Sequence, residues 1–182
     1  TNTTGSYNTA VGLNALENSD ADSNTAFGTS ALRANTTGAQ NVAVGRNALL
    51  ANTTGSRNIA IGISALDACD TETDNIAIGF EAMTTNNAGG VENIAIGSYA
   101  MDTLTSGDYN IGIGQSAMSN ITSGLRNIAI GVGTGFNITE AHDNTAMGYY
   151  SLRTQTTGAY NTALGYYALN ALTTAGNNTA IG

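Results

Sequence analysis

Apolar and polar positions alternate over short stretches of this chain. In the stretch Asn-Val-Ala-Val-Gly at residues 41–45, the small Ala43 lies between two valines. Alternation with a period of two and β-branched residues predicts a strand. The glycine that follows supplies backbone angles that other residues reach only with strain, so it predicts a bend. One short strand ending in a bend is therefore the expected local unit.

This unit returns throughout the chain at intervals of 16 to 18 residues, most often 17. An asparagine opens each repeat, at Asn8, Asn24, Asn41, Asn58, Asn75, Asn93, Asn110, Asn127, Asn144, Asn161 and Asn178. Self-similarity at a short fixed period is typical of a solenoid, in which one repeat forms one coil and buries its apolar residues only against its neighbours.

Counting from the asparagine as position one, position three is alanine in all repeats but one, position four is apolar and position five is glycine. The positions that define the repeat are represented by Asn41, Ala43, Val44, Gly45, Asn58, Ala60, Ile61 and Gly62. An Ala-Leu pair at positions eight and nine begins the return segment. A second glycine near the end of many repeats, such as Gly55, predicts a second bend.

The two faces of the expected strand differ in size. Alanine on one face predicts a narrow space, whereas the large residues on the other face predict a second packing surface. A single thin coil has only one interior, so we expect the leftover apolar face to meet another copy of the chain. The repeated asparagine has a structural explanation, because identical amides stacked at one coil position form a hydrogen-bonded ladder.

A helical fold is the competing interpretation, since alanine and leucine favour helices. It is the weaker one, because each repeat contains glycine, threonine and asparagine and lacks a 3.6-residue stripe. The expected fold is all-β, a parallel β-solenoid of about ten 17-residue coils. Coils stacked at about 4.8 Å form a rod about 48 Å long. Residues 1–182 form a single array, with partial repeats at 1–7 and 178–182, and these uncapped ends favour a piece of a longer protein or stacking on neighbouring subunits.

The charge balance excludes several function classes. The net charge is −8, there is no lysine, and only five arginines oppose thirteen acidic residues. Nucleic acid and anionic membrane surfaces need clustered positive charge, so neither is an expected partner. No apolar run is long enough for membrane insertion. We expect no cofactor and no catalytic or metal site.

The motif Asn-Thr/Ile-Ala-Ile-Gly-x-x-Ala-Leu resembles the head repeat of trimeric autotransporter adhesins. It is still more similar to the longer repeats of tail fibres of bacterial viruses, and the resemblance extends through every repeat from Asn8 onward. It implies a left-handed β-roll, three chains around one axis, and an extracellular place on a cell surface or virion. This repeat is longer than the adhesin-head repeat, and that difference leaves the turn shapes and the assembly open.

Two isolated residues carry little chemistry. His142 lies beside Asp143 in an irregular repeat, without a neighbouring serine or cysteine to form a nucleophilic site, and is expected to be a loop histidine. Cys69 is the only cysteine, so no disulfide forms within the chain, and we expect a buried or unreactive thiol.

Acidic residues cluster in one repeat, at Asp67, Asp70, Glu72 and Asp74. Carboxylates at such spacing could bind Ca²⁺. The glycine-rich pattern of calcium-binding rolls is missing, so a solvated acidic turn is the favoured interpretation.

Tyrosines crowd into two neighbouring repeats, at Tyr149, Tyr150, Tyr160, Tyr166 and Tyr167. Stacked tyrosines shield the edge of a coil and pair with one another, and this ladder is the favoured interpretation. Contact with a surface glycan or receptor is the alternative, because aromatic rings also stack on sugars.

The function that these patterns favour is structural: a stiff repeat segment of an extracellular fibre, with an attachment surface and a homo-oligomeric state, either a trimer or a stacked filament. An end-to-end self-assembling filament is the first alternative. A less favoured one is an ice-binding solenoid, because threonine pairs recur at coil spacing, at Thr36-Thr37, Thr53-Thr54, Thr156-Thr157 and Thr173-Thr174. An enzyme is not expected.

Overall fold

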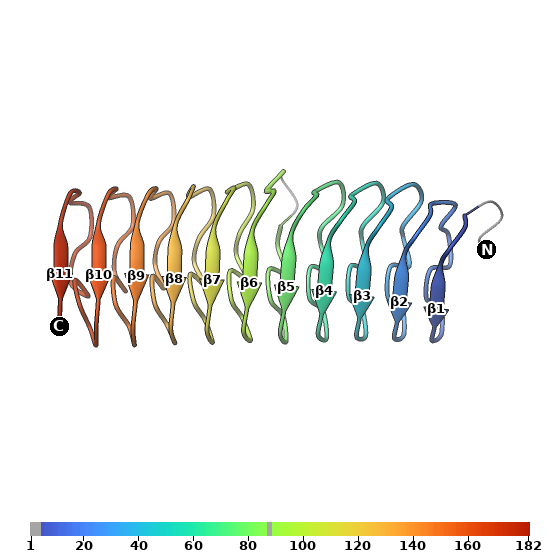
Figure 1. Ribbon diagram of the computed structural model, residues 1–182, viewed down its shortest axis with the longest axis horizontal. Coiled ribbons are helices and arrows are strands. Elements are labelled where there is room, and N and C mark those ends of the chain that lie inside the picture. The colour runs from blue at the N-terminus through green and yellow to red at the C-terminus, as the bar shows by residue number, and fades with distance from the viewer. Residues whose placement is uncertain (1–4, 87–88) are drawn as a thin grey trace.

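The computed structural model describes residues 5–86 and 89–182, which form a rod of stacked coils with one strand each (Figure 1). Each strand covers positions two to four of its repeat. The strands are β1 (Thr9–Val11), β2 (Thr25–Phe27), β3 (Val42–Val44), β4 (Ile59–Ile61), β5 (Ile76–Ile78), β6 (Ile94–Ile96), β7 (Ile111–Ile113), β8 (Ile128–Ile130), β9 (Thr145–Met147), β10 (Thr162–Leu164) and β11 (Thr179–Ile181).

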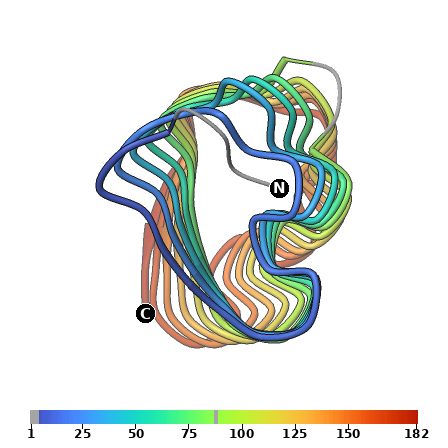
Figure 2. The same ribbon diagram turned by 90° about the vertical axis from the view of Figure 1, so that its right-hand side faces the viewer.

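All eleven strands belong to one parallel sheet whose spatial order is the sequence order. Each residue pairs with its equivalent in the next coil, as Ala43 pairs with Ala60. Viewed along the rod, the coils lie one behind another and are displaced progressively (Figure 2). The predicted parallel β-solenoid of about ten 17-residue coils is therefore confirmed.

Hydrogen bonds between coils continue outside the strands. The backbone N–H of Leu49 donates to the carbonyl of Ala65 at 3.0 Å, and that of Arg57 donates to Ala39 at 3.0 Å. A coil therefore satisfies its polar backbone groups against its neighbours around much of its circumference, although only three residues per coil are in strands.

The position-one asparagines form a buried ladder. The backbone N–H of Asn127 donates to Oδ1 of Asn110 at 3.0 Å, and Nδ2 of Asn110 donates to Oδ1 of Asn93 at 3.1 Å. The same Nδ2 donates to the carbonyl of Gly124, later in its own coil, at 2.7 Å. The predicted ladder is confirmed, with two additions: backbone amides supply many of its donors, and each side chain also ties together two parts of one coil.

The two recurring glycines are required for different reasons. Gly114, at position five, has a φ of 131°, and a Cβ there would lie 2.5 Å from the carbonyl oxygen of Gly131. Gly55, near the end of its repeat, has no left-handed φ, but a Cβ would lie 2.3 Å from the carbonyl oxygen of Glu72. The first glycine allows a backbone bend, whereas the second allows close approach between coils.

Residues other than glycine also adopt the left-handed region, at positions seven, nine and seventeen. Examples from one coil and its border are Arg57, Ser64 and Leu66, with φ values of 60°, 54° and 50°. Residues with a side chain rarely adopt this region. Here it recurs from coil to coil and shapes the turns before and after each strand.

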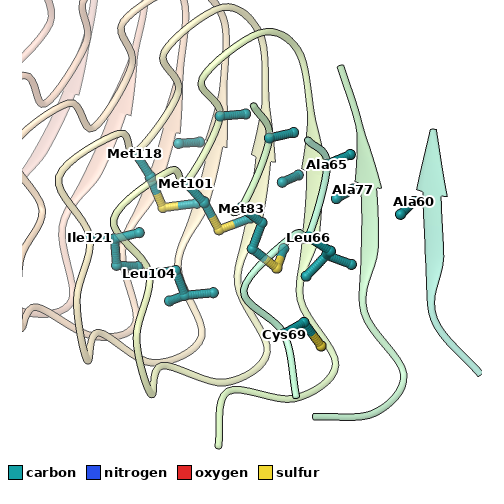
Figure 3. Packing of buried hydrophobic residues seen from close by; sticks show 14 of the residues in the cluster. Ala60, Ala65, Leu66, Cys69, Ala77, Met83, Met101, Leu104, Met118 and Ile121 are labelled. Atoms are coloured by element: carbon teal, nitrogen blue, oxygen red, sulfur yellow. The ribbon is translucent and has the colours of Figure 1, made fainter. Parts of the chain in front are cut away.

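The core is a thin column of small and medium side chains. Alanines at positions three and eight are buried except at the ends of the stack, and leucine or methionine fills position nine in every coil but one, which has Gly135. Met83, Met101 and Met118 follow one another along the stack (Figure 3). A Cβ on Gly112 would lie 3.2 Å from Cγ of Met101, and one on Gly135 would lie 3.2 Å from Cγ of Met118. The flexible methionines therefore pack where a neighbouring coil has glycine in place of a larger residue.

Candidate functional site

The outer face of the sheet is apolar and partly exposed to solvent. Positions two and four of each strand point away from the alanine column and are half-buried or exposed, in contrast to the buried position three. In the strands β4–β8 both positions are isoleucine. We call these ten residues the isoleucine patch: Ile59, Ile61, Ile76, Ile78, Ile94, Ile96, Ile111, Ile113, Ile128 and Ile130.

In three of the five coils of the isoleucine patch, an apolar residue at position six extends this face beyond the glycine bend, whereas the other two coils have Ser98 and Gln115 there. Ile63, Phe80 and Val132 are each about 40% exposed, at 41%, 40% and 40%. Neither position two nor position four carries a charged residue in any repeat. Contiguous apolar surface of this kind is typical of an interaction site. The predicted two-faced strand is thus present, and its larger side chains line the outside of the coil.

The tyrosines form one compact cluster that excludes Tyr160. The rings of Tyr149 and Tyr166 are stacked, with centroids 5.5 Å apart, and Tyr150 and Tyr167 meet them at steeper angles. This confirms the ladder between two coils. Tyr160 lies elsewhere, at position seventeen, where its backbone N–H donates to the carbonyl of His142.

Arg153 adds a positive charge to the tyrosine cluster. Its guanidinium carbon lies 4.7 Å from the centroid of the Tyr150 ring. Within residues 5–86 and 89–182, the ion pairs involve other arginines, so the charge of Arg153 is neutralised by no carboxylate there. Sequence reasoning missed this contact, although the three-residue spacing of Tyr150 and Arg153 was visible.

The acidic repeat differs from the solvated turn that we expected. Glu72 is buried, and its carboxylate accepts hydrogen bonds from the backbone amides of Asp70 at 2.7 Å, Thr71 at 3.0 Å and Gly89 at 3.0 Å. Buried carboxylates require such partners. The prediction was wrong for Glu72, because this residue occupies the coil position where other repeats have glycine, and its side chain turns into the neighbouring loop.

The other members of the acidic cluster have separate surroundings. Asp74 pairs with Arg57, and partial burial raises the pKa of Asp67 above its usual range. The part of the chain that the structure describes holds no group of three or more histidine, cysteine or acidic side chains arranged to bind a metal ion.

Two ion pairs join neighbouring coils at position seventeen. Arg57 donates from Nε and Nη2 to the carboxylate of Asp74, at 2.6 Å for both bonds. Arg126 makes the equivalent bonds to Asp143, at 2.7 and 2.9 Å. The hydrogen bonds from the arginines lower the pKa of both aspartates. Two-pronged pairing is the strongest geometry for this contact.

The lone cysteine and the lone histidine have different surroundings. Cys69 is buried, as predicted, and this burial raises the pKa of its thiol, so the reactive thiolate is disfavoured. His142 is exposed, and its described contacts are backbone bonds, as expected of a loop histidine.

The threonines that recur at coil spacing form hydrogen bonds between neighbouring coils through their hydroxyl groups. Oγ1 of Thr36 donates to the carbonyl of Thr53 at 2.9 Å, and Oγ1 of Thr156 donates to that of Thr173 at 3.2 Å. These hydroxyl protons point along the rod toward the next coil. The structure thus leaves fewer free donors on this face than a flat threonine array would offer.

Within the described residues, no helix is both long and apolar enough to cross a membrane. Comparisons of the chain with models of protein families, with curated proteins and with solved structures find no match.

Proposed function

We propose that this chain is a stiff segment of an extracellular fibre, in which three copies pack side by side through the outer faces of their sheets. The observation that carries the proposal is the uncharged apolar face, which continues through consecutive coils. Exposed apolar area of this extent favours association because burial stabilises by roughly 25 cal/mol per Å². The fibre would lie on a cell surface or virion, as the repeat resemblance implies.

The stiffness of the proposed fibre comes from the links between coils. Each coil is tied to the next by backbone hydrogen bonds around its circumference and by the buried asparagine ladder. In an array of this kind every repeat contacts only its neighbours, so stability is the sum of such interfaces along the rod. These links resist bending and stretching, which is the mechanical work of a shaft.

The proposal is tested by the mass of the purified chain in solution, measured over a wide concentration range. We expect a mass of three chains that persists on dilution. A chain that remains monomeric would contradict side-by-side packing. Growth of the mass without limit would instead support the end-to-end filament as the mode of assembly.

The tyrosine cluster is the proposed attachment surface of the fibre. Tyr166 is 69% exposed and stacked on Tyr149, and Arg153 lies beside Tyr150. Aromatic rings with a guanidinium suit a glycan that bears a carboxylate, since the rings contact the sugar and the guanidinium binds the acid.

A glycan array tests this surface directly. We expect binding to acidic glycans that the double variant Y166A/R153A loses, whereas Tyr109→Ala, which alters an exposed tyrosine elsewhere, retains it. Equal binding by both variants would rule out the tyrosine cluster as the attachment surface.

A further inference from the structure

The apolar character of the outer face is concentrated in the middle of the rod. Position two is isoleucine throughout β4–β8 and valine in β3, but threonine in β1, β2, β9, β10 and β11. The central coils therefore present two apolar side chains per strand, whereas the end coils present one apolar and one hydroxyl side chain. The strands with two outward apolar side chains are therefore consecutive and lie at the centre of the sheet.

The shape of the face indicates an elongated partner. Eleven strands spaced about 4.8 Å apart and three residues wide form a straight strip about 48 Å long and about 10 Å wide. That strip measures roughly 500 Å², below the ~800 Å² that each partner contributes to a standard interface. Ile63, Phe80 and Val132 widen it along one margin. A partner that runs alongside the rod covers more of this strip than one that touches it at a single point.

A second copy of this chain meets these requirements. It has the same shape and the same coil spacing, so the outward side chains of each coil can pack against those of a coil in the other copy. Two chains of net charge −8 repel each other over most of their surfaces. Their outer faces carry no charge at positions two and four, so the copies approach there with the least repulsion.

We propose that the isoleucine patch is the contact that holds copies of this chain together, and that the threonine-bearing end coils contribute little to the association. This inference rests on the proposed side-by-side fibre and assigns its partner contact to β4–β8, seen at the centre of the rod in Figure 1.

The test replaces three patch residues at position two with threonine, in the variant I76T/I94T/I111T. The fold accepts threonine at this position, because Thr145 and Thr162 occupy it in other coils. The matched control is V11T/L164T/I181T, which alters exposed apolar residues of the end coils. Circular dichroism before and after heating checks that both variants retain the fold.

Sedimentation then gives the dissociation constant of each assembly. We expect the patch variant to raise it at least about a hundredfold and the end variant to change it less than about threefold. Equal effects of the two variants, or a patch variant that associates as tightly as the natural chain, would overturn this inference but leave side-by-side assembly standing. A natural chain that never associates would overturn both proposals.

Disulfide cross-linking between introduced cysteines locates the contact without weakening the assembly. In an oxidising buffer, Ile94→Cys is expected to form disulfides between copies, while Thr9→Cys is not, and the buried Cys69 stays unreactive in both. Association without cross-linking at residue 94 would place the contact elsewhere on the rod.

Discussion

At the scale of single residues, the left-handed positions explain a gap in the composition of each repeat. Positions seven, nine and seventeen contain no valine, isoleucine or threonine, although these residues are frequent elsewhere in the repeat. Branching at Cβ is a genuine strain in this backbone region. The leucine or methionine at position nine is thus selected by backbone conformation as well as by the volume of the core.

An isomeric exchange separates the two effects. Leu66→Ile preserves side-chain volume but places a β-branched residue at a φ of 50°, so we expect a loss of about 2 kcal/mol in the free energy of unfolding. The reverse exchange Ile121→Leu, at a buried position without left-handed backbone, should cost less than about 1.5 kcal/mol. Chemical denaturation measures both, and equal losses would show that backbone strain is not decisive.

Two glycines of one coil provide a second contrast. Gly114→Ala places a Cβ 2.5 Å from a backbone oxygen at a φ of 131°, and should cost about 3 kcal/mol or more. Gly112→Ala restores the residue found at position three of the other coils and meets the flexible Met101. We expect a change within about 1 kcal/mol, and a large loss here would contradict the packing described.

The asparagine ladder should be costly to interrupt. Asn110→Ala leaves the backbone N–H of Asn127 and the carbonyl of Gly124 without their side-chain partner in a buried place, which predicts a loss of about 3 kcal/mol. The exposed Gln115→Ala in the same coil is the control and should change stability little. Thermal unfolding of the two variants decides the point.

At the scale of the coil, the ion pairs at position seventeen make stability depend on pH. Their aspartates have a lowered pKa in the folded chain, so they stabilise it above the ordinary aspartate pKa of about 3.9. This contribution is lost as pH falls through the lowered folded values. The melting temperature of the natural chain should therefore fall more steeply below about pH 4 than that of D74N/D143N.

The variant Glu92→Gln is the matched control for these pairs. Glu92 occupies the same coil position, but no ion pair of the described residues includes it. Its removal should leave the steep acid dependence in place. An unchanged acid profile in D74N/D143N would show that the exposed pairs contribute nothing measurable, as many such pairs do.

The sequence predicted the strand, its register and the coil length, because the residue types represented by Asn41, Ala43 and Gly45 recur with a fixed period and differ in size. It missed the direction of Glu72, since the irregular loop that supplies its partner at Gly89 breaks that period. It grouped Tyr160 with the tyrosine cluster by proximity in sequence, whereas position within the coil decides contact. The periodic part of the fold was predictable, and the departures from the period were not.

At the scale of the whole molecule, the single chain is a rod with a buried column on one side of its sheet and a bare apolar strip on the other. The coils stabilise one another along the rod, but none of residues 5–86 and 89–182 covers the strip. The proposed fibre resolves this imbalance through other copies of the chain. Lateral assembly thickens the rod without lengthening it, whereas end-to-end assembly lengthens it without thickening.

Small-angle X-ray scattering distinguishes these shapes most directly. We expect a particle about 48 Å long, the length of one stack of coils, whose cross-section is that of several chains packed side by side. A particle with the cross-section of one chain, whether as short as a single stack or many times longer, would contradict the claim that the apolar outer face joins copies laterally.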